Sequence, residues 1–211
     1  MADVKCRCDL ELVSDSFSRC LKDDRDILID PFLVGYDELC RLFPLLGTVF
    51  GFVAKDVSDK LSIMHQHRQS NTGPHYITVD SMVDFETTSG LTTTTGGGPS
   101  GSRTLLRLHR ALQFIMAFLR GVRSLKSDEK LSGIAAEAYN STLAAYHGWF
   151  VRQGVQLAMY TLPTKHELAI RMGLKNEDEY NKILDQLCDN TQPVYDKIQT
   201  IFTEYNVLDL P

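Results

Sequence analysis

Apolar positions along this chain recur every three or four residues, which is the spacing of amphipathic helices, and no segment alternates cleanly between apolar and polar residues. The pattern predicts an all-α protein whose helices pack in layers, and no internal repeat is evident. The predicted helices cover residues 10–21, 30–43, 44–67, 76–88, 102–126, 127–147, 149–162, 165–172 and 177–205.

Prolines and polar caps set several of these boundaries. Asp30 is predicted to cap the second helix, because Pro31 then occupies the first helical position, where its missing N–H has no partner to lose. Pro44 is predicted to kink the chain or to restart the helix after it, and Pro193 to break or kink the last helix.

The length and the apolar content suit one domain with a substantial core, expected over residues 1–211 with a flexible N-terminus at 1–9. Residues 89–101 are rich in threonine and glycine and are predicted to form a flexible loop. The glycine cluster there is not followed by Lys and Ser or Thr, so it does not match a phosphate-binding P-loop.

The helix predicted over residues 102–126 carries the most informative pattern. Six of its positions fall within about 100° of arc, which makes one face cationic at its start and apolar about two turns later. This face is roughly 22 Å long at about 1.5 Å per residue, close to the length of an extended acyl chain. Such a surface suits a phospholipid-like ligand. Its positions are Arg103, Arg107, Arg110, Phe114, Ala117 and Phe118.

An ordinary solvated basic face is the alternative for these arginines. No Asp or Glu occurs between Ser89 and Ser127, and like charges at helical spacing repel by a few tenths of a kcal/mol per pair, on the order of the i,i+4 interaction. An anion from elsewhere must therefore offset the stripe. Its apolar continuation argues against full solvation, because a face that runs into the core cannot be wholly wet.

The helix predicted over 44–67 has a matching stripe that passes from aliphatic to charged. If this helix packs antiparallel to the 102–126 helix, its charged end meets the arginines and its aliphatic end meets the phenylalanines. Taken alone, Asp56 and Lys60 could form an exposed i,i+4 pair worth only about 0.3–0.5 kcal/mol. The shared face contains Leu42, Leu46, Val49, Val53, Asp56, Lys60 and Ile63.

Taken together, the two stripes leave a formal charge near +3 that is costly to half-bury without an anion. A phosphate monoester brings a charge of about −2 and several acceptor oxygens, which guanidinium groups can bind in pairs. Asp56 then remains free to accept a hydrogen bond from a neutral amide or hydroxyl group.

The segment 146–149 adds a third element. His147 could be a capped or core imidazole, or it could donate to a carbonyl of a lipid. Trp149 is the only tryptophan and lies close to Tyr146, so this segment suits a membrane–water interface and would equally suit a core.

Composition narrows the class of protein further. The formal net charge of −5 argues against a nucleic-acid-binding protein. The five cysteines lack metal or redox spacing and are expected to be reduced thiols. The N-terminus has no apolar signal core, and no run of about 18 uncharged apolar residues occurs. We therefore expect a cytoplasmic protein that associates peripherally with intracellular membranes.

Several segments together resemble the glycolipid transfer protein superfamily, and most closely its ceramide-1-phosphate transfer branch. The resemblance implies a two-layer, all-α helical sandwich that encloses one lipid pocket, extracts a sphingolipid from one membrane and delivers it to another. The segments are 47–50 leading into 55–60, 103–112, 144–149, 161–164 and the closing 208–211.

The same resemblance implies roles for the polar residues. Asp56 and His147 would engage the amide and the carbonyl of ceramide, and Lys60, Arg103 and Arg107 would hold the phosphate. Arg110, on the same face, is a weaker candidate for direct contact. Glycolipid-binding members carry Trp and Asn at the positions of Arg107 and Lys60. The two cations here favour a phosphosphingolipid, ceramide-1-phosphate, over a glycosphingolipid.

The expected apolar residues fall into two sets. The membrane contact is predicted to involve Phe32, Tyr146 and Trp149. The pocket for the lipid chains is predicted to involve Leu42, Phe43, Phe50, Val53, Phe114, Ile115, Phe118, Phe150 and Val151.

No catalytic group, metal or cofactor is expected, and a monomer suffices for a carrier. Three alternatives stay open: a lipid phosphatase using Asp56 and His147, a lipid sensor that binds without shuttling, and a glycosphingolipid carrier. The first lacks a recognisable nucleophile–base pair.

Overall fold

The computed structural model describes residues 8–23, 26–174 and 176–211, and it confirms an all-α protein. Short 3-10 helices connect some of its elements: η2 (Thr48–Phe50), η3 (Gly73–Tyr76) and η4 (Ala144–Tyr146). The helices are α1 (Leu10–Ser18), α2 (Ile29–Leu39), α3 (Leu42–Leu46), α4 (Gly51–Gln69), α5 (Val79–Thr88), α6 (Gly101–Ser124), α7 (Ser132–Ser141), α8 (Trp149–Met159), α9 (Lys165–Met172) and α10 (Glu177–Glu204).

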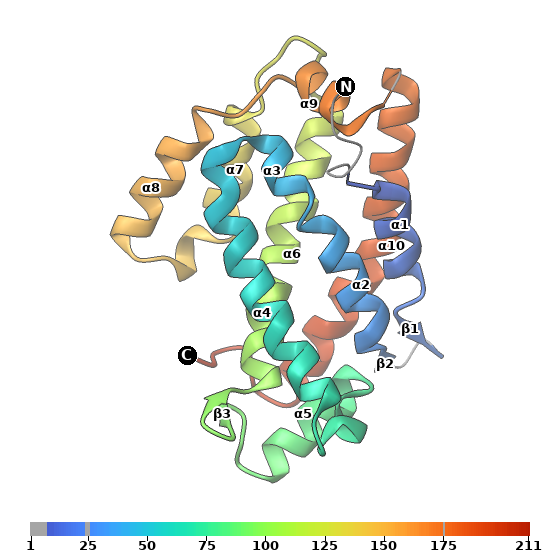
Figure 1. The fold of residues 1–211 in the computed structure, drawn as a ribbon, viewed down its shortest axis with the longest axis vertical. Coiled ribbons are helices and arrows are strands. Elements are labelled where there is room, and N and C mark those ends of the chain that lie inside the picture. The colour runs from blue at the N-terminus through green and yellow to red at the C-terminus, as the bar shows by residue number, and fades with distance from the viewer. Residues whose placement is uncertain (1–7, 24–25, 175) are drawn as a thin grey trace.

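The long helices form two layers (Figure 1). α2 and α4 lie in one layer, and α6 and α10 lie behind them in the other. α1 packs against both α2 and α10 and closes one edge. α4 and α6 are in contact and run in opposite directions, as the two stripes predicted. α8 projects from the opposite edge, where it packs mainly against α7.

Apolar side chains fill the space between the layers. Leu105, Leu108 and Leu112 of α6 are completely buried there, because helical spacing turns all three toward α10 and the opposite layer. The cavity that remains between α1, α2, α6 and α10 is only about 10 Å³. This space between the four helices is therefore too small for a lipid chain, which could enter it only if the layers moved apart.

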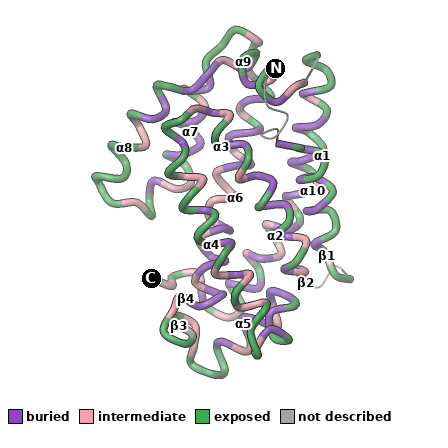
Figure 2. Tube along the Cα trace, in the orientation of Figure 1, coloured by how far each residue is buried: buried purple, intermediate pink, exposed green. Residues whose placement is uncertain are grey.

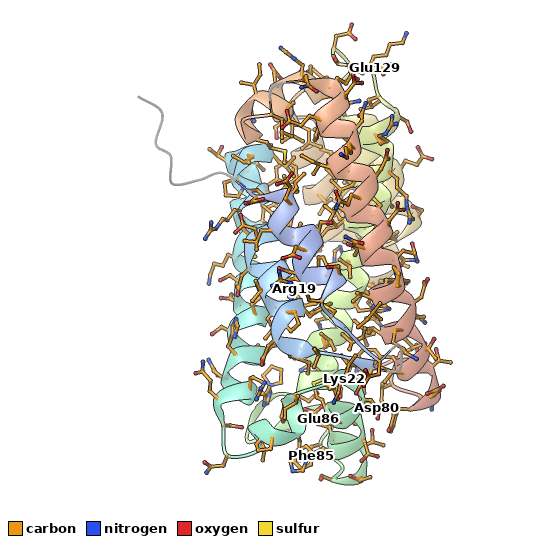
Figure 3. The ribbon with its side chains drawn as sticks, turned by 90° about the vertical axis from the view of Figure 1, so that its right-hand side faces the viewer. Arg19, Lys22, Asp80, Phe85, Glu86 and Glu129 are labelled. Atoms are coloured by element: carbon orange, nitrogen blue, oxygen red, sulfur yellow. The ribbon has the colours of Figure 1, made fainter. Side chains whose placement is uncertain are left out.

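A buried carboxylate holds the start of α6. Glu86 of α5 is fully buried and accepts hydrogen bonds from the backbone N–H groups of Gly101 (2.7 Å) and Ser102 (2.8 Å) and from the Tyr76 hydroxyl (2.7 Å). Figure 3 shows Glu86 at the lower end of the molecule. A Cβ on Gly101 would lie 2.6 Å from the Met82 sulfur, so glycine permits this close approach. This contact and the Ser100 side chain, which accepts from the Arg103 N–H, together cap the start of α6.

Two short β-hairpins lie in segments for which no strand was predicted. β1 (Leu21–Lys22) pairs antiparallel with β2 (Asp26–Ile27), and β3 (Thr94–Thr95) with β4 (Gly98–Pro99). The second hairpin and the first residue of α6 lie within the predicted flexible loop 89–101. Each strand has two residues, which is too short to show an alternating pattern in the sequence.

The helix predicted over 127–147 is the shorter α7 followed by η4, and the boundary signals predicted at Asp30 and Pro44 were wrong. α2 begins at Ile29 without a side-chain cap, and the Asp30 carboxylate instead pairs with the Arg68 guanidinium at 2.9 Å through both oxygens. Pro44 lies inside the first turn of α3, where its missing N–H has no helical partner. The chain turns instead at Gly47, whose φ of 137° favours glycine.

The two ends of the chain also differ from their predictions. α10 continues through Pro193 without a break, supported by its packing against α1 and α6. Of the predicted flexible N-terminus 1–9, residues 1–7 lie outside the described residues. Cys8 is buried, and Asp9 caps α1 by accepting from the Leu12 N–H.

The cysteines that the structure describes are free thiols, as predicted, while Cys6 lies outside the described residues. Cys8, Cys20 and Cys188 are buried and Cys40 is partly buried. Burial raises the pKa of Cys8 and of Cys20 to about 12, so these two thiols stay protonated and unreactive near neutral pH.

His109 of α6 predicts a specific pH dependence of stability. Its ring is buried, stacks on Tyr195 with centroids 4.2 Å apart, and places Nε2 2.8 Å from the Gln199 side-chain oxygen. Burial lowers the pKa of His109 to about 4. Between pH 6.5 and about pH 4, His109 therefore binds a proton in the unfolded chain but not in the folded chain. The free energy of unfolding consequently falls as the pH falls.

We expect this group alone to lower the free energy of unfolding by about 3 kcal/mol between pH 7 and pH 4. Urea unfolding of the natural chain and of His109→Phe at both pH values measures the effect. The variant keeps an aromatic ring for Tyr195 but cannot titrate, so it should show a smaller loss. Equal losses in both proteins would show that His109 does not contribute.

Candidate phosphate-binding site

Charged residues from two layers meet where α4 passes α6. Asp56 and Lys60 lie on the second and third turns of α4, and three arginines lie on the first turns of α6. Because the helices are antiparallel neighbours, the charged end of each stripe faces the other. Burial lowers the pKa of both Arg107 and His147, and the negative charge of Asp56 opposes this effect in each case.

Lys60 and Asp56 form the α4 half of the site. The Lys60 ammonium lies 2.6 Å from a carboxylate oxygen of Asp56, one turn earlier. The Lys60 side chain is only 18% exposed, whereas the Asp56 side chain is 67% exposed. Lys60 is therefore the more buried member of the pair, and Asp56 is the member more open to solvent.

Arg107 is the central cation on α6. Burial lowers the pKa of Arg107, and the positive charges of Arg103 and Arg110 lower it further. Within the described part of the chain, none of these three arginines forms an ion pair with an Asp or Glu side chain. The cluster therefore concentrates positive charge on one face of α6, which is the property of an anion site.

Carbonyl oxygens take up part of the hydrogen-bonding capacity of the arginines. Arg107 Nη2 donates to the Pro211 oxygen at 2.7 Å, and Arg103 Nε donates to the same atom. Arg110 Nη2 donates to the Leu208 oxygen at 2.6 Å. The closing segment 208–211 therefore lies directly on the arginines.

Arg110 also stacks on an aromatic ring. Its guanidinium carbon lies 3.9 Å from the centroid of the Tyr146 ring, within the range of a cation–π interaction. This contact joins the arginine stripe to η4, which precedes His147.

His147 lies in the turn between η4 and α8, and its ring is oriented by a neighbour. Nδ1 lies 2.8 Å from the Tyr139 hydroxyl. Burial lowers the pKa of His147, the positive charges of Lys60 and Arg152 add to this effect, and Asp56 opposes it. The imidazole is therefore neutral near pH 7. When Tyr139 donates to Nδ1, Nε2 bears the proton and can donate to a ligand.

The sequence pattern missed three contributors. Tyr139 orients His147 from α7, Arg152 of α8 donates to the His147 carbonyl at 2.9 Å, and the segment 208–211 covers the arginines. The segment 208–211 is one of those that resemble the family, but this resemblance does not indicate which residues the segment contacts. No periodicity links Tyr139 to His147, because their contact crosses the irregular turn after α7.

The predicted apolar pocket residues lie in two environments. Most of those on α3, η2, α4 and α6 are buried or half-buried at the layer interface: Leu42, Phe43, Phe50, Val53, Phe114, Ile115 and Phe118. Ile115 also lines the small central cavity. Val49, which was predicted to share the stripe of the 44–67 helix but not to line the pocket, is exposed, because it belongs to η2, which Gly47 puts out of phase with α4.

Phe150 and Val151 contradict the pocket prediction. Phe150 is 84% exposed and Val151 is also exposed, because α8 packs on α7 with its opposite face in solvent. Figure 2 shows α8 exposed along most of its length. These two residues lie outside the pocket in this structure.

Phe32 contradicts the membrane-contact prediction. Its ring is fully buried, 5.9 Å from the Phe17 centroid and 5.0 Å from the Tyr36 centroid. Helical spacing puts Phe32 on the buried face of α2 with Ile29 and Tyr36, at i, i+3 and i+7. Trp149 and Tyr146 are exposed, and the Trp149 side of α8 forms an apolar surface with Phe150.

A family profile described as "Glycolipid transfer protein (GLTP)" matches residues 27–174, which is more than half of the chain. The chain belongs to the glycolipid transfer protein family. The fold is therefore that family's two-layer helical sandwich, which in its members encloses a lipid pocket.

Some members of the glycolipid transfer protein family are similar to this chain over nearly its whole length. The chain is 38% identical to the ceramide-1-phosphate transfer protein of Rattus norvegicus over 96% of each chain. The apo crystal structure of mouse ceramide-1-phosphate transfer protein matches with a TM-score of 0.90 and 39% identity, covering 96% of this chain and 99% of that one. The human protein in complex with 12:0 ceramide-1-phosphate matches with a TM-score of 0.89 and 36% identity, covering 97% and 100%.

None of the helices in the described ranges combines the length and the apolarity that a membrane crossing requires. In the same ranges, no three His, Cys, Asp or Glu side chains gather in a way that could hold a metal ion.

Proposed function

We propose that this chain binds ceramide-1-phosphate and carries it between membranes without changing it chemically. The supporting observation is the cluster of Lys60, Arg103 and Arg107 beside Asp56 and His147, at the end of an apolar layer interface. The relatives of highest similarity among those described are named for transfer of this lipid, and one is solved in complex with it.

Different polar side chains of the site bind different parts of the lipid headgroup. Lys60, Arg103 and Arg107 supply the donors for the phosphate oxygens, and the two arginines do so with planar pairs of N–H groups. The free oxygen of Asp56 accepts from the ceramide amide, and His147 Nε2 donates to the carbonyl. None of these steps breaks a covalent bond.

The lipid chains enter between the layers. The cavity of about 10 Å³ lies against Leu112 and Ile115, and binding enlarges it by separating α2 from α6 and α10. Burial contributes roughly 0.8 kcal/mol per CH₂ group, which nearly equals what the bilayer supplies. Transfer is therefore close to neutral in free energy and can run in both directions.

The protein acts as a monomer in the cytoplasm and touches the membrane only transiently. The apolar side of α8, around Trp149 and Phe150, rests in the interfacial layer. This placement brings the headgroup site, which begins at His147, to the membrane surface.

A vesicle assay tests the proposal. Donor vesicles contain fluorescent ceramide-1-phosphate or a fluorescent glycosphingolipid, and acceptor vesicles contain neither. We expect transfer of the phosphorylated lipid only, with no release of inorganic phosphate. Transfer of the glycosphingolipid would indicate a glycolipid carrier, binding without transfer a sensor, and released phosphate a phosphatase; each result would contradict the proposal.

The double variant Trp149→Ala/Phe150→Ala should reduce membrane partition and the transfer rate about tenfold, because two exposed aromatic rings no longer enter the interface. Vesicle sedimentation and the transfer assay measure both effects. Val34→Ala, which truncates an exposed apolar residue on α2, is the matched control and should change neither. Full activity of the double variant would remove α8 from the membrane contact.

A further inference from the structure

The closing segment 208–211 occupies the hydrogen-bond donors that a phosphate group would use. The Pro211 oxygen accepts from Arg103 and Arg107, and the Leu208 oxygen accepts from Arg110. Three guanidinium groups thus bind two carbonyl oxygens of one short segment. The Arg107–Pro211 distance of 2.7 Å is that of a charge-assisted hydrogen bond.

The local structure directs the segment to this place. α10 ends at Glu204, and Asn206 adopts a left-handed conformation with φ of 55°, which reverses the chain. The Val207 N–H donates to the Phe202 oxygen at 3.0 Å, and the Val207 side chain is buried. The chain after Val207 therefore leaves the end of α10 in a fixed direction, toward α6.

Weak apolar contacts hold the segment on the arginines. Leu208 and Leu210 are partly buried and pack at the edge of the core, whereas Asp209 and Pro211 are exposed. Two partly buried leucines stabilise the contact much less than two fully buried ones would. Leu208 and Leu210 are therefore the apolar anchors of the segment.

We propose that residues 208–211 form an internal substitute for the lipid phosphate, which lies on Arg103, Arg107 and Arg110 in the lipid-free protein and is displaced when the headgroup binds. Backbone oxygens of the segment satisfy these guanidinium donors, and the one at Leu208 is a peptide carbonyl without a full negative charge. A phosphate monoester of charge about −2 therefore replaces them favourably. The cost of displacing the segment lowers the affinity for the lipid and assists its release into the acceptor membrane.

This inference rests on the proposed function, and the double variant Leu208→Ser/Leu210→Ser tests it. The variant removes the apolar contacts of the segment and leaves every arginine and Val207 in place. We expect it to bind soluble short-chain ceramide-1-phosphate about tenfold more tightly in titration calorimetry, on the order of the contribution of one charge-assisted hydrogen bond. The control Leu208→Met/Leu210→Met keeps the apolar contacts and should bind like the natural chain. Unchanged or weaker binding by the serine variant would overturn the proposal.

NMR relaxation of the Leu208, Asp209 and Leu210 amides supplies a second test on the full chain. We expect these amides to be ordered without lipid and mobile after short-chain ceramide-1-phosphate is added. They should also become mobile without lipid in Arg107→Leu, which removes one of the anchoring donors. Amides that stay ordered while the lipid binds would overturn the substitute role.

The two tests separate this proposal from the proposed function. If the natural chain binds no ceramide-1-phosphate, yet Arg107→Leu frees the segment, the proposed ligand is wrong and the contact between the segment and the arginines is real. If the lipid binds and is transferred while the segment stays in place, the proposed function stands and the substitute role is wrong.

Discussion

Replacing Arg107 by leucine should lower the affinity for ceramide-1-phosphate by about 10–100-fold and slow its transfer between vesicles at least as strongly. Arg107 lies at the centre of the cationic cluster, where its neighbours and its burial already lower its pKa. A hydrogen bond to a charged group contributes about 1.5–3 kcal/mol, and about 1.4 kcal/mol corresponds to a tenfold change in affinity. Lys60 and Arg103 remain in the variant, so we expect a reduced affinity and not a complete loss of binding.

The matched control for this variant is Arg120→Leu. Arg120 lies on the same helix and is exposed, and its guanidinium donates to Gln192 of α10 at 2.7 Å, away from the cluster. We expect Arg120→Leu to transfer lipid like the natural chain, and both variants to keep the far-ultraviolet circular dichroism of a helical protein. Undiminished transfer by Arg107→Leu would remove this arginine from the mechanism.

Replacing Glu86 by alanine should lower the free energy of unfolding by about 3–6 kcal/mol, the largest stability effect expected in this chain. Its carboxylate accepts from Gly101, Ser102 and Tyr76 in a fully buried place. Each donor left without a partner costs about 1–3 kcal/mol, and the start of α6 also loses a favourable negative charge. Urea unfolding measures the loss.

Glu86→Ala should also disturb the headgroup site. Arg103 lies two residues after Gly101, so fraying of the first turn of α6 displaces that arginine before Arg107 or Arg110. We therefore expect weaker lipid binding at temperatures well below the unfolding midpoint. Glu137→Ala, at an exposed position of α7, is the control and should leave both stability and binding within about 0.5 kcal/mol. A stable Glu86→Ala protein would show that water replaces the carboxylate.

The sequence predicted the long helices well, because their apolar spacing extends over many turns. The helix predicted over 102–126 is α6, and the short one predicted over 165–172 is α9. The errors lie at the ends, as at Asp30 and Pro44, where a distant partner or a glycine determines the boundary. The caps there depend on contacts that spacing does not record.

The sequence also predicted which charges would meet, but only on the assumption that two helices pack antiparallel. That assumption was correct for α4 and α6. The apolar predictions failed where the surroundings of a helix were unknown: Phe32 is in the core and Phe150 is in solvent. Helical phase indicates which residues share a face, but it does not indicate what covers that face.

By itself, the sequence determined the all-α class, the two stripes and the excess of positive charge among the arginines, since each depends only on residue type and helical spacing. Tertiary structure alone decided that Tyr139 orients His147, that Glu86 holds the start of α6 and that residues 208–211 lie on the arginines. These contacts join residues that are remote in the chain or separated by irregular turns, so no local period encodes them. They exist because α4, α6 and α10 are held together by a shared apolar interior, which places the ends of these helices within hydrogen-bond distance.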